Sequence, residues 1–249
     1  MWLEKYKPKT LNEFIGNSKA IYDLKKTHKK NENNLFIITG QTGYGKTLLS
    51  ELFLKDNGYE INVLSNCQEQ KNSCLKEKLE NMLTFKNIIE LMSTKKFAII
   101  LKDVDTMIND VLKIIANSTI KRTVFIILNN NKNLKKLKKY NIIELKQPDL
   151  PSIEKYLFDI FIENKYLVCN EGLKLLYNSS NGDIRHIILF LEELYFYVIR
   201  KKKELGLPKD KFYTVNENEI NTFIEIKKKD ISYDIYTCIK HLLFKKNDI

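Results

Sequence analysis

One stretch of the chain, residues 35–54, constrains the fold more than any other. It opens with five apolar or β-branched residues, 35–39, which predict a buried strand. An apolar periodicity over 48–54 predicts a helix. The eight residues between them match the phosphate-binding pattern G-x-x-x-x-G-K-[ST]: Gly40, Gln41, Thr42, Gly43, Tyr44, Gly45, Lys46 and Thr47. Strand, loop and helix in this order predict an α/β fold with an anion-binding turn.

The residue types in this loop suit phosphate chemistry. Glycines let consecutive backbone N–H groups curl around an anion, and the N-terminus of the following helix adds its dipole. We expect Lys46 to reach the β- and γ-phosphates and the Thr47 hydroxyl to hold Mg²⁺. The sequence therefore predicts a site for a nucleoside triphosphate.

Composition constrains the class of protein less than the phosphate-binding motif does. The chain has 249 residues, 43% of them apolar, and a net charge of +11 from 42 basic and 31 acidic side chains. This charge favours a polyanion such as nucleic acid. Lysine, asparagine and isoleucine are, however, frequent throughout, as an AT-rich genome produces without functional demand. Charge alone leaves both explanations open.

Cysteine usage and hydropathy indicate the compartment. The four cysteines are scattered, with no C-x-x-C pair, so a zinc site is not expected and a reducing compartment fits best. The N-terminus lacks the apolar segment of a signal peptide. No apolar run approaches the roughly 20 residues of a membrane helix. We expect a soluble, intracellular protein without a membrane partner.

Later segments complete the predicted architecture. Apolar runs at 59–64, 97–101, 123–128 and 142–145 predict four more strands, giving a parallel five-stranded sheet with intervening helices that include 70–93. Pro148 and Pro151 mark a boundary, so residues 1–150 form the nucleotide-binding domain. From residue 152 the pattern is helical only, with helices expected at 152–164, 170–178 and 183–203. Residues 151–212 are therefore predicted to form a small helical lid.

The N-terminal segment carries a family resemblance. The matching residues are Trp2, Glu4, Lys5, Tyr6, Pro8, Lys9, Leu11, Phe14, Ile15, Gly16 and Asn17. They resemble the N-terminal box of replication factor C subunits, the AAA+ clamp loaders. Because this box packs over the adenine in that family, the resemblance implies that Tyr6, Pro8 and Ile15 line the base pocket.

Two further positions match motifs of the same family. Asn129 follows the fourth strand, at the sensor 1 position, whose asparagine orients the attacking water or contacts the γ-phosphate. Residues 182–185 read Gly-Asp-Ile-Arg and resemble sensor 2, which implies that Arg185 contacts the γ-phosphate from the lid. Arginine suits this role because it is always charged and offers a planar fork of donors.

The acidic motif after the third strand departs from the family. Residues 102–105 read Lys-Asp-Val-Asp where the family has Asp-Glu-x-Asp. In strict register Lys102 replaces the Mg²⁺-binding aspartate and Asp103 replaces the catalytic glutamate, whereas a one-residue bulge would bring Asp103 to the metal. A displacement near 1 Å can cost about 100-fold in rate, so the shorter Asp103 predicts impaired hydrolysis.

Two more departures concern assembly. Residues 138–141 read Lys-Lys-Tyr-Asn where small clamp-loader subunits carry Ser-Arg-Cys, so the arginine that reaches a neighbour's site is missing, as in the family's large subunit. Family members also continue into a helical collar. Residues 213–249 correspond only to the start of that collar.

The resemblance implies an ATP-binding, large-subunit-like clamp-loader subunit that acts in DNA replication with ATP and Mg²⁺. Its partners would be other clamp-loader subunits, a sliding clamp that it opens, and primer-template DNA held through phosphates. It would lie in the nucleus of a eukaryotic cell, or otherwise in the cytoplasm or at a viral replication site. Two alternatives stay open: a catalytically inert structural AAA+ subunit, and a stand-alone P-loop nucleotide kinase, which leaves Arg185 unexplained.

Overall fold

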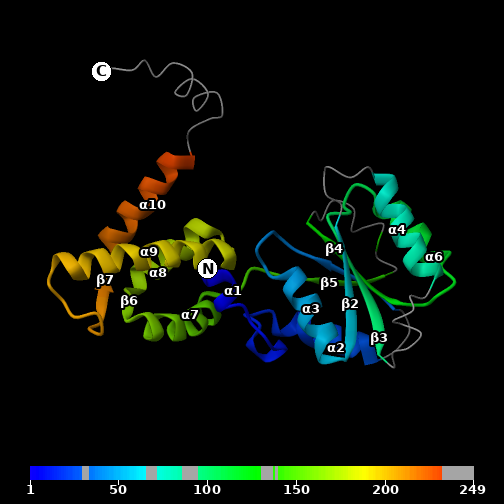
Figure 1. The fold of residues 1–249 in the computed structure, drawn as a ribbon, viewed down its shortest axis with the longest axis horizontal. Coiled ribbons are helices and arrows are strands. Elements are labelled where there is room, and N and C mark those ends of the chain that lie inside the picture. The colour runs from blue at the N-terminus through cyan, green and yellow to red at the C-terminus, as the bar shows by residue number, and fades with distance from the viewer. Residues whose placement is uncertain (30–33, 66–71, 86–94, 130–136, 138–139, 232–249) are drawn as a thin grey trace, which may run out of the picture. The chain divides into compact units, whose positions relative to one another are not determined.

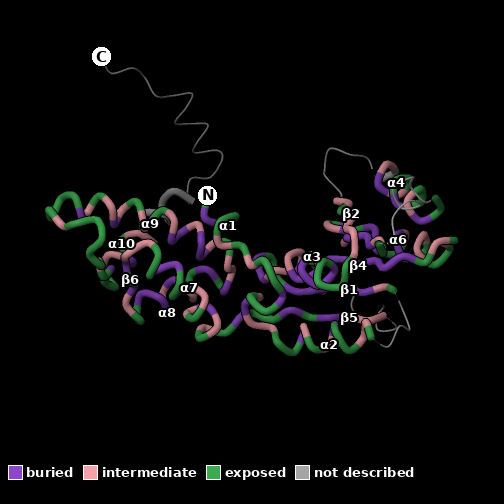
Figure 2. Tube along the Cα trace, turned by 60° about the horizontal axis from the view of Figure 1, so that its bottom comes forward, coloured by how far each residue is buried: buried purple, intermediate pink, exposed green. Residues whose placement is uncertain are grey.

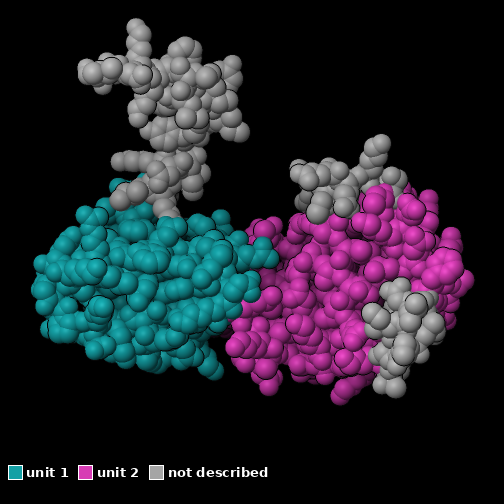
Figure 3. All heavy atoms as spheres, viewed as in Figure 1, with its two compact units in different colours: residues 1–6, 153–249 teal, residues 7–152 magenta. Residues whose placement is uncertain are grey.

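The computed structural model describes residues 1–29, 34–65, 72–85, 95–129, 137 and 140–231. The chain divides into two compact units, which Figure 3 distinguishes by colour. One unit consists of residues 7–152, and the other combines residues 1–6 with the chain from 153 onwards. The polypeptide therefore passes between the units twice, after Tyr6 and after Ser152.

The unit of residues 7–152 is built on a parallel five-stranded sheet of order β2-β3-β4-β1-β5. Its strands are β1 (Leu35–Thr39), β2 (Tyr59–Ser65), β3 (Lys96–Lys102), β4 (Thr123–Leu128) and β5 (Asn141–Glu144). All of β4 is buried, as expected for a strand covered on both faces. The predicted α/β fold with a parallel five-stranded sheet is confirmed.

Helices cover both faces of this sheet (Figure 1). They are α2 (Ser18–Lys29) and α3 (Lys46–Asp56) on one face and α4 (Asn72–Thr84) and α6 (Ile108–Ala116) on the other, with a short 3-10 turn, η1 (Leu11–Glu13), before α2. Strand residues alternate between the two faces: Ile38 packs with α3, and Ile37 packs with α4 and α6. The apolar strands form the buried centre of this unit in Figure 2.

One helix ends earlier than the sequence predicted. A helix was expected over 70–93, whereas α4 ends at Thr84; residues 70–71 and 86–93 of this prediction lie outside the described part. The backbone carbonyl of Leu83 accepts a hydrogen bond from the N–H of Ile120 at 3.1 Å. Arg122 also donates to the carbonyl of Phe85 at 3.0 Å. These distant groups satisfy carbonyls at the helix end, which local periodicity cannot reveal.

The second unit is mainly helical. It contains α1 (Trp2–Lys5), most of α7 (Leu150–Asn164), α8 (Asn170–Ser180), α9 (Ile184–Glu204) and α10 (Glu217–Ile231). It also holds a two-stranded parallel sheet of β6 (Tyr166–Val168) and β7 (Tyr213–Val215). The expectation of helices alone after residue 152 was therefore wrong, because three-residue strands are too short to show an alternation. The predicted collar stays a prediction, and its residues 232–249 lie outside the described part.

The first six residues are bound tightly to this helical unit. Trp2 is only 8% exposed and its ring lies 5.4 Å from that of Tyr195 on α9. The Trp2 N–H donates to Glu192, also on α9, at 3.1 Å. Tyr156 donates its hydroxyl proton to the carbonyl of Tyr6 at 2.6 Å, and Asn164 donates to the Tyr6 hydroxyl at 2.8 Å. These six residues, which we call the N-terminal strap, are thus anchored on α7 and α9.

Within the described residues, no helix has the length and apolar character needed to cross a bilayer.

Candidate nucleotide site

The loop between β1 and α3 has a conformation that requires glycine. Gly40, Gly43 and Gly45 have φ angles of 145°, 87° and 84°. A Cβ at Gly40 would lie 2.6 Å from the carbonyl oxygen of Leu145, and one at Gly45 would lie 3.0 Å from the ring of Phe14. Side chains at these two positions would meet both backbone strain and a close neighbour. The loop is therefore packed against the residues behind it.

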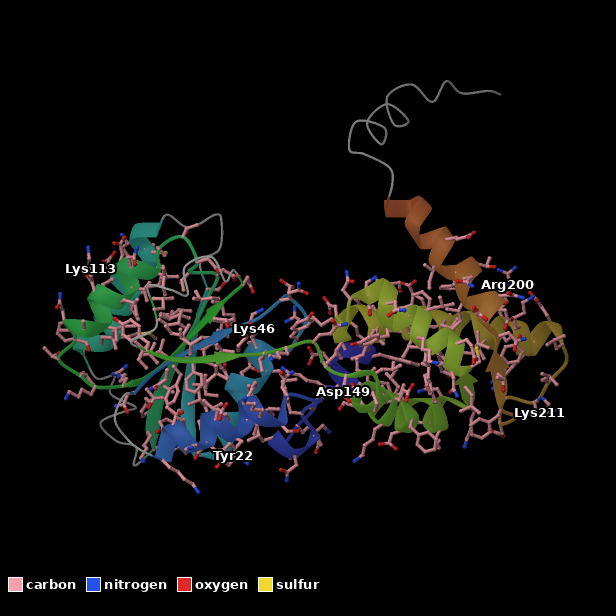
Figure 4. All side chains as sticks on the ribbon, turned by 180° about the vertical axis from the view of Figure 1, so that it is seen from behind. Tyr22, Lys46, Lys113, Asp149, Arg200 and Lys211 are labelled. Atoms are coloured by element: carbon pink, nitrogen blue, oxygen red, sulfur yellow. The ribbon has the colours of Figure 1, made fainter. Side chains whose placement is uncertain are left out.

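Lys46, the first residue of α3, is the principal cation of this loop (Figure 4). It is only 5% exposed, and its ammonium donates to the carbonyls of Gly40 at 2.9 Å and Gln41 at 2.8 Å. Thr47 follows it and is half-buried, whereas Thr42 is exposed. The Tyr44 hydroxyl donates to the Gln41 side chain at 2.8 Å. The loop thus holds its lysine close to its own backbone at a helix N-terminus, where an anion is favoured.

Parallel strands place their carboxyl ends at one edge, and β4 lies between β1 and β3. At this edge Asp103 lies just after β3 and Asn129 just after β4. The Asn129 side-chain amide donates to Asp103 at 3.4 Å, and its backbone N–H donates to Asp105 at 2.9 Å. The Ser65 hydroxyl, at the end of β2, donates to the other Asp103 oxygen at 3.0 Å. Asp103 and Asn129 are therefore neighbours, as their places after adjacent strands predict.

Lys102 occupies the last position of β3. The ladder between β2 and β3 runs without a break from Tyr59–Lys96 to Ser65–Lys102, so no bulge precedes Asp103. Asp103 itself has a φ of 56°, which turns the chain immediately after the strand. Within the described residues no group of three or more His, Cys, Asp and Glu side chains could hold a metal ion. At the carboxyl end of β3, the exposed carboxylate of Asp103 therefore directly follows Lys102 in the chain.

Arg185 is placed in the helical unit by a capped helix start. Asp183 is the N-cap of α9, and its carboxylate accepts from the backbone N–H of Arg185 at 2.9 Å and of His186 at 3.2 Å. Aspartate is among the residues preferred at a helix N-cap, because its side-chain oxygen accepts from the free backbone N–H groups of the first turn. The Arg185 side chain is exposed in the first turn of α9. Its contact with a γ-phosphate stays a prediction.

Comparisons with known proteins find one family model and several curated relatives. The family described as "Sigma-54 interaction domain" matches residues 15–123. A replication factor C large subunit of Methanococcus aeolicus is 26% identical over 208 residues, covering 78% of this chain and 43% of that protein. Replication factor C subunit 1 of Saccharomyces cerevisiae is 27% identical over 232 residues, covering 78% of this chain and 26% of that protein. The chain is therefore similar to replication factor C subunits over most of its length.

Comparison with solved structures concerns the fold. The structure of a RuvB variant from Thermotoga maritima covers 89% of this chain and 72% of its own, with a TM-score of 0.63 and 16% identity. At that identity the likeness shows the fold alone. The chain spans less than half the length of the two curated relatives.

The replication factor C-like base pocket stays a prediction. Tyr6 belongs to the N-terminal strap, whereas Pro8 and Ile15 belong to the α/β unit. Ile15 is buried and Pro8 is half-buried. The position of the missing arginine finger is only partly visible, because residues 138–139 lie outside the described part.

Sequence reasoning missed three residues that support the site. Phe14 lies behind Gly45 and Leu145 behind Gly40, and Ser65 holds Asp103. Phe14 was noted only as part of the N-terminal box, and Leu145 only as the end of a strand. None of these contacts has a local signal, because each joins segments far apart in the chain.

Proposed function

We propose that this chain is the ATP-binding, large-subunit-like component of a replication factor C-like clamp loader. Such an assembly opens a sliding clamp and places it on primer-template DNA. The observation that supports this best is the glycine-constrained loop with Lys46 at the start of α3, in a chain similar to replication factor C subunits over 78% of its length. The helix N-terminus and the bound lysine fit a phosphate chain.

We expect the nucleotide to be held by the loop together with the residues that the family resemblance implies. Backbone N–H groups of the loop would cradle its phosphates, and Lys46 would exchange its backbone carbonyl partners for β- and γ-phosphate oxygens. Arg185 would approach the γ-phosphate, and Tyr6, Pro8 and Ile15 would line the base pocket. Thr47 and Asp103 are the candidate Mg²⁺ ligands, and a bound Mg²⁺ would neutralise phosphate charge.

We further propose that hydrolysis at this site is weak. Asp103 is one methylene shorter than the glutamate of the family pattern, and its carboxylate is engaged by Ser65 and Asn129. A general base must reach the water that it activates, so a retracted carboxylate lowers the rate. An inert structural AAA+ subunit is therefore the second candidate, supported by Lys102. ATP hydrolysis measured alone and with partner subunits separates the two.

Assembly is tested by affinity capture from the native source. We expect the tagged chain to recover small clamp-loader subunits when ATP is present, and Lys46→Ala to recover fewer of them. Recovery should not depend on DNA, which nuclease treatment checks. Failure to recover any clamp-loader subunit or sliding clamp would contradict the proposed assembly, and would leave nucleotide binding to be judged on its own.

A further inference from the structure

We propose that Lys102 binds phosphate and replaces much of the charge that Mg²⁺ supplies in P-loop proteins, so that nucleotide affinity here depends little on Mg²⁺. This inference rests on the proposed nucleotide binding at residues 40–47.

The register of β3 determines the side of the sheet on which Lys102 lies. Ala98 and Ile100 pack in the cluster that includes α3, whereas Ile99 and Leu101 pack on the opposite face with α4 and α6. Side chains alternate along a strand, so Lys102 lies on the α3 face. It is also the last residue of β3, at the edge where α3 begins. Lys102 and the N-terminus of α3 therefore share one face and one edge.

The distance across the sheet suits a phosphate chain. Only β4 lies between β3 and the loop strand β1, so two strand spacings, roughly 10 Å, separate them. A triphosphate that extends from the loop across the end of β4 would approach Lys102. Lysine is a compact charge on a flexible stem with three donors, and it binds phosphate as a point charge.

Among the residues that the structure describes, none compensates the charge of Lys102. Its side chain is half-buried, and within the described residues no ion pair or hydrogen bond engages its ammonium. The neighbouring Asp103 carboxylate accepts instead from Ser65 and Asn129. A partly desolvated cation without a counter-ion is unfavourable, so an anion bound at this edge would stabilise it.

The same position suits Mg²⁺ poorly. Mg²⁺ prefers oxygen ligands, commonly one or two carboxylates together with phosphates and water. Here an ammonium stands at the strand end, where it would repel a divalent cation, and Asp103 is the nearest exposed carboxylate in sequence. The chain therefore provides at this edge a fixed cation where the family pattern provides a metal ligand.

The test compares ATP affinity in excess Mg²⁺ and in excess EDTA by calorimetry. We expect wild-type affinity to change by less than about tenfold between the two conditions, because Lys102 remains as a cation. Lys102→Ala should weaken binding in EDTA by about tenfold to a hundredfold, the range for a hydrogen bond to a charged group, and by less in Mg²⁺. Lys102→Asp should make binding strongly dependent on Mg²⁺.

Lys96→Ala is the matched control, because Lys96 is an exposed lysine at the opposite end of the same strand. It should bind ATP as the wild type does in both conditions. Equal losses in Mg²⁺ and EDTA for Lys102→Ala, or wild-type binding that disappears in EDTA, would overturn the role of Lys102 while leaving nucleotide binding intact. Absence of ATP binding by the folded wild type in both conditions would overturn both proposals.

Discussion

At the scale of single residues, two glycines and one lysine decide what the loop can bind. Gly40 and Gly45 bring the loop against Leu145 and Phe14, and Lys46 lies over the loop carbonyls. These positions concern the binding of a phosphate chain. In the proposed function, turnover would depend instead on Asp103, which stands where the replication factor C pattern has a glutamate. The loop could then bind a phosphate chain while hydrolysis stays weak.

Gly40→Ala tests the close approach of the loop backbone to the Leu145 carbonyl group. Its added Cβ would lie 2.6 Å from the Leu145 carbonyl oxygen at a positive φ. We expect it to lower the free energy of unfolding by about 2–4 kcal/mol, from backbone strain and displacement of β5 together, and to abolish ATP binding.

The control is Gly58→Ala, which also has a positive φ but has no atom within 4 Å of the added Cβ. It should cost about 1 kcal/mol and leave ATP binding unchanged. Urea unfolding and calorimetry measure both quantities. An equal loss in the free energy of unfolding for the two variants would show that the close approach to Leu145 does not contribute to the effect of Gly40→Ala.

Sequence alone identified most of the loop side of the site, because each residue there acts through its own local chemistry. Glycines predict the tight turn, and Lys46 and Thr47 follow at fixed spacing. The contacts of Asn129 and Ser65 with Asp103 could not be predicted in this way, because both depend on a sheet order in which β3 lies between β2 and β4.

At the scale of elements, the N-terminal strap and α10 are attached to the helical unit by specific contacts. The strap packs Trp2 against α9, and α10 is fixed by Glu219. One Glu219 oxygen accepts from the hydroxyls of Tyr197 and Tyr213, each at 2.8 Å, and the other accepts from the backbone N–H of Asn216 at 2.9 Å. A single carboxylate thus joins α9, β7 and α10.

Trp2→Ala tests the strap. Removing a buried tryptophan typically costs about 3–5 kcal/mol, and we expect a loss near 3 kcal/mol because the strap lies at the chain end. Phe196→Ala, on α9 but 63% exposed, should change the free energy of unfolding by less than about 0.5 kcal/mol. Circular dichroism during urea unfolding gives both values. A wild-type value for Trp2→Ala would mean that the strap adds nothing to stability.

Glu219 makes the helical unit sensitive to acid. Burial raises its pKa, but the hydrogen bonds from Asn216, Tyr213 and Tyr197 outweigh this and hold the pKa below its usual 4.5. As pH falls below about 4.5, the unfolded chain takes up a proton before the folded chain does. The stability that Glu219 provides above this pH is therefore lost as the folded pKa is passed.

Glu219→Gln should lower the free energy of unfolding at pH 7 by about 1–3 kcal/mol, the range typical of a charged hydrogen-bond acceptor. It should also flatten the decline of this free energy between about pH 5 and pH 3, because the glutamine does not titrate. Glu217→Gln, an exposed neighbour in the same helical turn, should do neither. Urea unfolding curves at several pH values measure the free energy of unfolding of each variant. An unchanged acid decline in Glu219→Gln would contradict the assigned cause.

Element boundaries were predictable where periodicity was long. Helices α7, α8 and α9 begin and end within two residues of the expected positions. β6 and β7 were missed because a three-residue strand has too few positions to show a pattern, and their pairing joins residues 166–168 to 213–215. The early end of α4 depends on Ile120 and Arg122, which lie far along the chain.

At the scale of the whole molecule, the chain joins an α/β unit and a helical unit through two crossings of the backbone. The loop residues lie in the first unit and Arg185 lies in the second. The strap and the later residues of the N-terminal box, 7–17, also belong to different units. The chain spans less than half of the length of the two curated relatives. Clamp opening and DNA binding are therefore proposed for the whole assembly and are not assigned to residues of this chain.

The most direct test measures bound nucleotide and its chemical state together. The chain is equilibrated with radiolabelled ATP and Mg²⁺, separated from free nucleotide, and the bound label is identified by chromatography. We predict near-stoichiometric binding with most label recovered as ATP, and no binding by folded Lys46→Ala. Binding by Lys46→Ala equal to that of the wild type would contradict nucleotide binding at this loop, and recovery mainly as ADP would contradict weak hydrolysis.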